Sequence, residues 1–107
     1  MKRKPWIYII GKVGDLTDDR YYEMVCLKFA NRKRELELLG YVVLNPMELV
    51  PRGTDWETAM RICIPVMLQC KFISTLTDYT ESRGGMIEYE LAGKFDYKNI
   101  QPSKVNE

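Results

Sequence analysis

Histidine is absent from the 107 residues of this chain. Without an imidazole, the sequence excludes the Ser-His and Cys-His couples of many hydrolases, and it lacks the commonest zinc ligand. Any chemistry would fall to carboxylates, tyrosines, lysines or the backbone. No pattern of residues predicts a metal site, and we expect no cofactor.

An excess of one charge sign is also missing, because 16 Lys and Arg face 15 Asp and Glu, for a net charge of +1. So weak a field argues against nucleic acid as a partner. A hydrophobic content of 46% beside 29% charged residues argues against disorder. The length favours a single domain over residues 1–107, with a polar tail over about residues 102–107.

Long apolar runs and paired cysteines are lacking as well. The apolar segment Trp6–Ile10 is too short for a signal sequence or a membrane span. The three cysteines, Cys26, Cys63 and Cys70, have no CxxC spacing and lie in apolar stretches, which predicts buried, reduced thiols. We therefore expect a cytoplasmic protein with no membrane partner.

Short apolar runs that end on turn residues predict the strands of a parallel sheet. The first is Trp6–Ile10, which ends at Gly11. The second is Tyr41–Leu44, closed by a turn at Asn45-Pro46. The third covers Cys70–Leu76, and a short fourth strand is expected around residues 99–101.

Helical patterns fill the intervals between these runs. The first extends from about Arg20 to Leu39, with Asp18 or Asp19 as its cap and Gly40 as its stop. A polar loop is predicted over residues 77–81.

A second helix is predicted after Thr54 or Asp55. Either residue can cap it, and Thr54 has capping-box spacing with Glu57. Pro65 removes one hydrogen bond late in this helix, which predicts a kink or a boundary near Ile64.

A third helix is predicted from Arg83 or Gly84 to Phe95, with Ile87, Leu91 and Phe95 on one face. Strands and helices then alternate along the chain with short connections. Right-handed crossovers predict an α/β fold with about four parallel strands between two layers of helices, a doubly wound arrangement of the flavodoxin-like or Rossmann-like kind. Ligands bind such folds beyond the carboxyl ends of the strands.

Two glycine-containing segments lie at that edge of the predicted sheet. Gly11-Lys12-Val13-Gly14 matches neither a Walker loop nor a GxGxxG fingerprint, so it is either a phosphate contact through Gly11 or a plain loop. Ser82-Arg83-Gly84-Gly85 opens a helix, where free N–H groups and the helix dipole favour an anion. Arg83 could add a forked contact, although a simple Ser82 cap with a solvated Arg83 fits equally.

Two glutamates follow on the same helix. Glu88 and Glu90 lie about 200° apart around the axis, so at most one can point into a site, and Glu88 is the candidate nearer the crevice. The helix dipole should lower the pKa of a carboxyl group there. A solvated glutamate is the plainer alternative.

Three further polar residues end strands at this edge. Tyr8 could cover a base or a sugar, or it could be an ordinary core tyrosine. Asn45 and Asp78 could bind a ligand or serve as turn residues.

Residues 7–11, 39–46 and 82–88 together resemble a family of small bacterial and phage proteins of unassigned function. That family is allied to the nucleoside 2-deoxyribosyltransferases and the 2′-deoxynucleoside 5′-phosphate N-hydrolases. The resemblance covers about residues 6–95, and its most specific part is the Ser-x-Gly-x-x-x-Glu spacing that ends at Glu88.

The resemblance implies a role for each matching residue. Glu88 would be the nucleophile that forms a covalent deoxyribosyl ester, as in a retaining glycosidase. Tyr8 would line the sugar pocket, and Asp78 would be the acid that assists departure of the base. Ser82 and the amides of Gly84 and Gly85 would hold a 5′-phosphate or hydroxyl.

Two functions follow from these expectations. The first is an N-glycosidase or deoxyribosyltransferase acting on deoxyribonucleosides or their 5′-monophosphates, with a hydrolase favoured over a transferase. The second is a nucleotide-binding module without catalysis. We also expect a homo-oligomer, a dimer or higher, because the relatives complete their sites from a neighbouring subunit and because four large side chains exceed what outer helices need, namely Tyr21, Tyr22, Trp56 and Met60.

Overall fold

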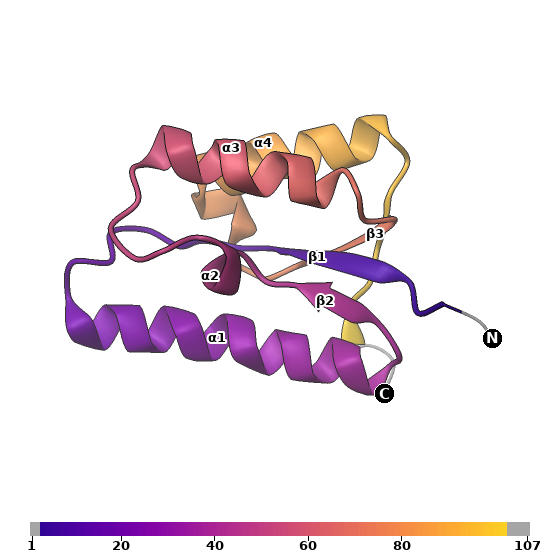
Figure 1. Cartoon of the computed structure of the whole chain (residues 1–107), viewed down its shortest axis with the longest axis horizontal. Coiled ribbons are helices and arrows are strands. Elements are labelled where there is room, and N and C mark those ends of the chain that lie inside the picture. Colours follow the sequence, from indigo (N-terminus) through magenta and orange to yellow (C-terminus); the bar gives the residue numbers. More distant parts are fainter. Residues whose placement is uncertain (1–2, 103–107) are drawn as a thin grey trace.

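Four parallel strands form the central sheet of the computed structural model, which describes residues 3–102 (Figure 1). The strand order is β2-β1-β3-β4. β1 (Trp6–Ile10) pairs with β2 (Val42–Leu44) on one side and with β3 (Phe72–Thr75) on the other, and β4 (Lys98–Asn99) pairs with β3. This confirms the predicted α/β fold with an all-parallel sheet. The predicted polar tail, apart from Pro102, lies outside the described residues.

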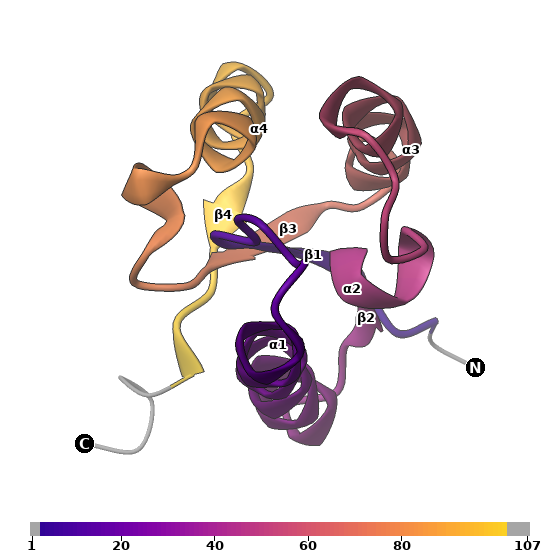
Figure 2. The ribbon, with the colours of Figure 1, turned by 90° about the vertical axis from the view of Figure 1, so that its left-hand side faces the viewer.

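Helices cover both faces of the sheet, as Figure 2 shows. α1 (Asp19–Leu38) lies on one face, and α3 (Trp56–Met67) and α4 (Arg83–Lys94) lie on the other. Because side chains alternate along a strand, β1 supplies both layers of the core. The α1 layer contains the buried side chains Ile7, Ile9, Val25, Phe29, Leu36, Val43 and Leu76. The layer under α3 and α4 contains Tyr8, Ile10, Cys63, Met67, Cys70, Ile73 and Ala92.

The ends of α1 follow the predicted signals. Asp18 caps the helix by accepting a 2.8 Å hydrogen bond from the Tyr21 N–H. Gly40 follows the helix at a φ of 98°, a conformation that favours glycine. Cys63 and Cys70 are buried free thiols, whereas Cys26 is only half-buried, because it lies on α1 outside the stripe that faces the sheet.

The predicted details of α3 need two corrections. Asp55 caps the helix through the Thr58 N–H, whereas the Thr54 hydroxyl donates to the Pro51 carbonyl, so the capping box is wrong. The helix also continues through Pro65 to Met67, so no boundary lies near Ile64. Proline there removes one hydrogen bond late in the helix, and the burial of Met67 keeps the last turn on the sheet.

Two short elements lie where the sequence predicts only turns and loops. α2 (Pro46–Leu49) follows β2, with Asn45 as its cap through the Met47 N–H and with Pro46 in its first turn. A 3-10 helix, η1 (Tyr79–Glu81), replaces most of the polar loop after β3. Both are too short to show a periodic pattern in the sequence.

The face that α4 turns to the core differs from the predicted one. Phe95 is 59% exposed and lies beyond the helix, whereas the buried positions are Gly84, Gly85, Glu88 and Ala92. The three small residues among them, Gly84, Gly85 and Ala92, let α4 approach the sheet and α3 closely. As a consequence Glu88, and not a large apolar side chain, enters the interior.

None of the helices in the described part of the chain combines the length and apolarity needed to cross a membrane.

Candidate functional site

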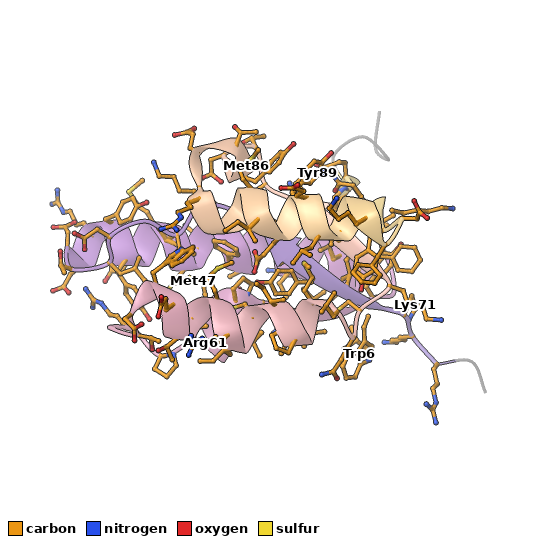
Figure 3. The ribbon with its side chains drawn as sticks, turned by 90° about the horizontal axis from the view of Figure 1, so that it is seen from above. Trp6, Met47, Arg61, Lys71, Met86 and Tyr89 are labelled. Atoms are coloured by element: carbon orange, nitrogen blue, oxygen red, sulfur yellow. The ribbon has the colours of Figure 1, made fainter. Side chains whose placement is uncertain are left out.

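A cleft of about 860 Å³ opens at the carboxyl edge of the sheet. Its walls are the loop after β1, the segment from α2 to the start of α3, and the N-terminal turns of α4. Figure 3 shows α3 and α4 side by side over the sheet. Both helices follow strands by crossover connections, so their N-termini meet at the same edge. The cleft is therefore where the fold predicts a ligand site.

Tyr8 and Glu88 meet at the inner end of this cleft. The Tyr8 hydroxyl donates a 2.7 Å hydrogen bond to Glu88 Oε2. Both residues line the cleft, although Tyr8 is only 1% exposed and Glu88 only 6%. Tyr8 is on the face of β1 that points toward α3 and α4, and Glu88 is on the buried face of α4. Glu90 is exposed, so of the two glutamates only Glu88 points into the site.

Burial controls the acidity of this pair. Desolvation raises the pKa of Glu88 to about 7, and the hydrogen bond from Tyr8 opposes that rise only in part. The sequence-based expectation of a lowered pKa is therefore wrong, because burial outweighs the helix dipole. Desolvation and the nearby Glu88 charge also raise the pKa of Tyr8 well above its ordinary value. Tyr8 thus remains a hydrogen-bond donor at neutral pH.

Cys63 is the nearest group that could compete as a nucleophile. It lines the cleft beside Tyr8 and belongs to the same buried cluster. Burial raises the pKa of its thiol to about 11, so the thiolate is scarce at neutral pH. Glu88, with a pKa of about 7, is consequently the more readily ionised of the two groups at neutral pH.

The N-terminus of α4 forms the second part of the site. Ser82 caps the helix and accepts a 3.0 Å hydrogen bond from the Gly85 N–H. A Cβ atom at Gly85 would lie 3.1 Å from the Tyr79 carbonyl oxygen, and one at Gly84 would lie 2.8 Å from Met60 Sδ. These glycines therefore allow close backbone packing, and all of Ser82, Gly84 and Gly85 line the cleft.

Arg83 stacks on an aromatic ring beside that N-terminus. Its Cζ lies 4.1 Å from the centroid of the Trp56 ring, and both residues line the cleft. Within residues 3–102, no carboxylate lies close enough to form an ion pair with Arg83. The guanidinium is therefore positioned by Trp56 while its charge remains available to an anion.

The loop after β1 forms the outer wall. A Cβ atom at Gly11 would lie 2.5 Å from Leu76 Cδ1, so a side chain there would collide with the core. Arg52 donates hydrogen bonds of 2.9 and 2.7 Å to the Leu16 carbonyl, and it forms an ion pair with Asp19. Arg52 thereby ties the loop before α3 to the loop after β1.

The structure does not bring Asp78 and Asn45 into the cleft. Asp78 lines a separate pocket of about 330 Å³, where it pairs with Lys28 Nζ at 2.6 Å and accepts from the Lys12 N–H at 3.0 Å. Burial tends to raise the pKa of Asp78, but these hydrogen bonds outweigh it and the pKa lies below its ordinary value. Asp78 therefore remains ionised, and it does not line the cleft that contains Glu88. Asn45 is buried as the cap of α2.

Of the four large side chains that suggested a subunit contact, two contact other parts of the chain and two line the open cleft. Tyr21 packs against the α1 layer of the core, and Tyr22 lies under Arg52, whose Cζ is 4.2 Å from the ring centroid. Trp56 and Met60 line the cleft. The sequence held a usable signal for this placement. Residues 56, 60 and 63 share one face of a helix that begins at the carboxyl edge of the sheet.

Among residues 3–102, no group of three or more Cys, Asp and Glu side chains is placed so that it could hold a metal ion.

Residues 5–100 match one family model, described as a domain of unknown function, DUF4406. No curated protein and no solved structure matches the chain. The resemblance to the deoxyribosyltransferases thus depends on the residues quoted for it. The match covers nearly the whole length, and the chain accordingly belongs to the DUF4406 family.

Proposed function

We propose that this protein is an N-glycosidase that cleaves the bond between base and sugar in deoxyribonucleosides or their 5′-monophosphates, with Glu88 as the nucleophile. The observation that carries the proposal is the 2.7 Å hydrogen bond from Tyr8 to Glu88 at the inner end of a large cleft. An oriented, nearly buried carboxylate is the group that such a reaction needs, and it requires no histidine for activation.

The reaction proceeds in two balanced steps. In the first, a carboxylate oxygen of Glu88 forms a bond to C1′ while the bond from C1′ to the base nitrogen breaks, and the departing base takes a proton from solvent. In the second, water attacks C1′, the ester to Glu88 breaks, and the water gives up one proton. One water molecule is consumed, and free base and 2-deoxyribose, or its 5-phosphate, are released.

Tyr8 positions the nucleophile. Its hydroxyl holds Glu88 Oε2 and stabilises the ionised form, which opposes the cost of burial. As the ester forms, the carboxylate loses its charge, and the other oxygen, Oε1, has no hydrogen-bond partner within residues 3–102. That oxygen is the one we assign to the attack on C1′.

The N-terminus of α4 suits the 5′ end of the substrate. Free N–H groups in the first turn and the helix dipole attract an anion. Arg83 adds a cation that no acidic residue in the described part of the chain neutralises. A 5′-phosphate at Ser82–Gly85 would place the sugar toward Glu88, one and a half turns along the same helix.

A second candidate is a nucleotide-binding module without turnover. The position of Asp78 favours it, because the residue assigned as the acid is paired with Lys28 in a separate pocket. Under that alternative, the cleft retains the ligand and Glu88 contributes only a hydrogen bond.

Incubation with 2′-deoxynucleosides and their 5′-monophosphates, followed by chromatography of the products, separates the two candidates. The glycosidase releases free base. A module without turnover releases none, yet its melting temperature rises with nucleotide concentration. If no compound in the panel is cleaved and none raises the melting temperature, both candidates are contradicted.

A further inference from the structure

We propose that the wall of the cleft opposite α4 is a subsite for the base, and that it accepts the base by stacking and apolar contact alone. This apolar wall comprises Met47, Val50, Trp56, Ala59 and Met60. The inference rests on the proposed function and adds a property that the reaction does not require. The protein should discriminate only weakly among the four bases.

The position of the wall relative to Glu88 supports this assignment. Trp56, Met60 and Cys63 lie about one turn apart along α3, and Cys63 lies beside Tyr8 at the inner end of the cleft. Met47, which follows β2, also lines the cleft and packs against the core layer under α1. A base attached to a sugar at Glu88 would therefore lie along α3, while the 5′ group points to the start of α4.

Trp56 supplies an aromatic surface held in a fixed orientation. Arg83 Cζ lies 4.1 Å from the centroid of the Trp56 ring. Trp56 Nε1 lies 3.3 Å from the position that a Cβ atom at Gly84 would take. The side chain nevertheless remains 42% exposed. Stacking on such a ring tolerates any base, because every base presents a π-face.

The neutral amide and imidazole side chains that can read the edge of a base are missing from the described lining of the cleft. None of the described residues that line it is Asn or Gln, and the chain contains no His. Amides and imidazoles are the neutral groups that can match both donors and acceptors on a base. The cleft therefore lacks the side chains on which most base discrimination depends.

Apart from Tyr8 and Glu88 at its inner end, the polar side chains that line the cleft are occupied or exposed. Arg52 is bonded to the Leu16 carbonyl and Asp19, Tyr22 lies under Arg52, and Thr17 and Arg83 are exposed. The Thr54 hydroxyl donates to the Pro51 carbonyl, and Ser82 caps α4. Lys12 and Glu81 form an exposed pair, and Asp15 is exposed at the rim. Strong selection requires a buried polar group that the wrong ligand leaves unpaired. An exposed group is satisfied by water with any base.

The first test measures binding without turnover. Glu88→Gln keeps an acceptor for Tyr8, and the dissociation constants of this variant for dAMP, dGMP, dCMP and dTMP are compared by calorimetry. We expect the four constants to agree within about tenfold. A wider spread would overturn the base inference while leaving the glycosidase proposal intact. Failure of all four monophosphates and of the four free deoxynucleosides to bind would overturn both.

The second test removes the aromatic surface. Trp56→Ala should weaken the binding of all four monophosphates by roughly tenfold or more, which is the usual effect of losing one stacked base. 2-Deoxyribose 5-phosphate should lose less affinity than the four nucleotides, because it loses only the support that Trp56 gives to Arg83. Trp56→Phe should restore most of the nucleotide affinity. If 2-deoxyribose 5-phosphate and the nucleotides lose affinity equally, Trp56 acts only through Arg83. That result would overturn the assignment of Trp56 to the base subsite. Matched thermal unfolding of the variants confirms that each one is folded.

Discussion

The Tyr8 hydroxyl and the Glu88 carboxylate, 80 positions apart in the sequence, are joined by a 2.7 Å hydrogen bond. β1 brings the tyrosine to the face of the sheet that α4 covers, and the small residues of α4 admit the glutamate. Both strand and helix are parts of the rigid core, so the pair is held by the fold and not by a loop. This relationship underlies the predictions below.

Removal of the Tyr8 hydroxyl should shift the pH dependence of activity. The hydrogen bond lowers the pKa of Glu88, so Tyr8→Phe should raise it above the present value of about 7. In the proposed mechanism the ionised carboxylate is the nucleophile, so the acid limb of kcat/KM should move to higher pH. We expect a loss of roughly ten- to a hundredfold at neutral pH, as for a hydrogen bond to a charged group.

Tyr97→Phe is the matched control for that experiment. Tyr97 also packs against the core layer under α3 and α4, and its hydroxyl donates a 3.2 Å hydrogen bond to the Met67 carbonyl, away from the cleft. Its pH profile should match the wild type. An unchanged acid limb in Tyr8→Phe, or the same shift in both variants, would contradict the assigned role of Tyr8.

The burial of Glu88 should also appear in the stability of the protein. Its pKa is about 7 in the folded state, against an ordinary value of about 4.3 for the unfolded chain. Between these values the folded state binds the extra proton, so the contribution of Glu88 to stability is greatest below about pH 4.3 and is lost as the pH rises through 7. The whole effect is of the order of 4 kcal/mol.

Glu88→Gln removes this titration. The free energy of unfolding of the variant, minus that of the wild type, should increase between pH 5 and pH 8 in urea unfolding experiments. Other titrating groups are common to both proteins and cancel. A difference that stays constant or falls with pH would show that Glu88 ionises normally.

Gly11 offers a test of the close packing below the cleft. The Cβ atom of Gly11→Ala would lie 2.5, 3.0 and 3.1 Å from three atoms of Leu76, so the buried side chain must move. We expect a loss of about 1–3 kcal/mol in the free energy of unfolding. Gly93→Ala, with nothing within 4 Å of the new atom, should gain about 0.5–1 kcal/mol as a helical substitution. Equal effects of both substitutions would contradict the packing argument.

Much of the fold was predictable because the strands are continuous apolar runs and the helices carry local caps. The residues Trp6–Ile10 and the cap Asp18 are examples in which short-range pattern alone decides the structure. The direction of Glu88 relative to Glu90 also follows from helical geometry. The pKa of Glu88 does not follow from helical geometry. It depends on how deeply Glu88 is buried, and therefore on how closely Gly84 and Ala92 let α4 approach its neighbours.

The remaining site residues depend on contacts between distant segments. Asp78 ends a strand at the correct edge, yet Lys28 of α1 reaches it from 50 positions away and holds it outside the cleft. In the sequence, Trp56 counts among four large side chains that exceed what outer helices need, which predicts a subunit contact. Only the N-termini of α3 and α4, placed together in space, identify it as part of the cleft.

The oligomeric state stays a prediction of its own. Tyr21 and Tyr22 contact other parts of the chain, whereas Trp56 and Met60 line the open cleft. The expectation of a homodimer or higher assembly therefore depends on these two side chains and on the resemblance to the deoxyribosyltransferases. We propose that assembly and expect sedimentation equilibrium at micromolar concentration to give at least twice the mass of 12.6 kDa. A monomeric mass would contradict it.

The most direct test of the central claim compares base release by the wild type with that by Glu88→Gln and Glu90→Gln. Both glutamates lie on α4, but only Glu88 points into the cleft. We predict that the wild type and Glu90→Gln release free base from a 2′-deoxynucleoside 5′-monophosphate at similar rates. Glu88→Gln should release none while it unfolds at a temperature no lower than that of the wild type at pH 8. Base release by Glu88→Gln at the wild-type rate, or none from the wild type, would contradict the proposed mechanism.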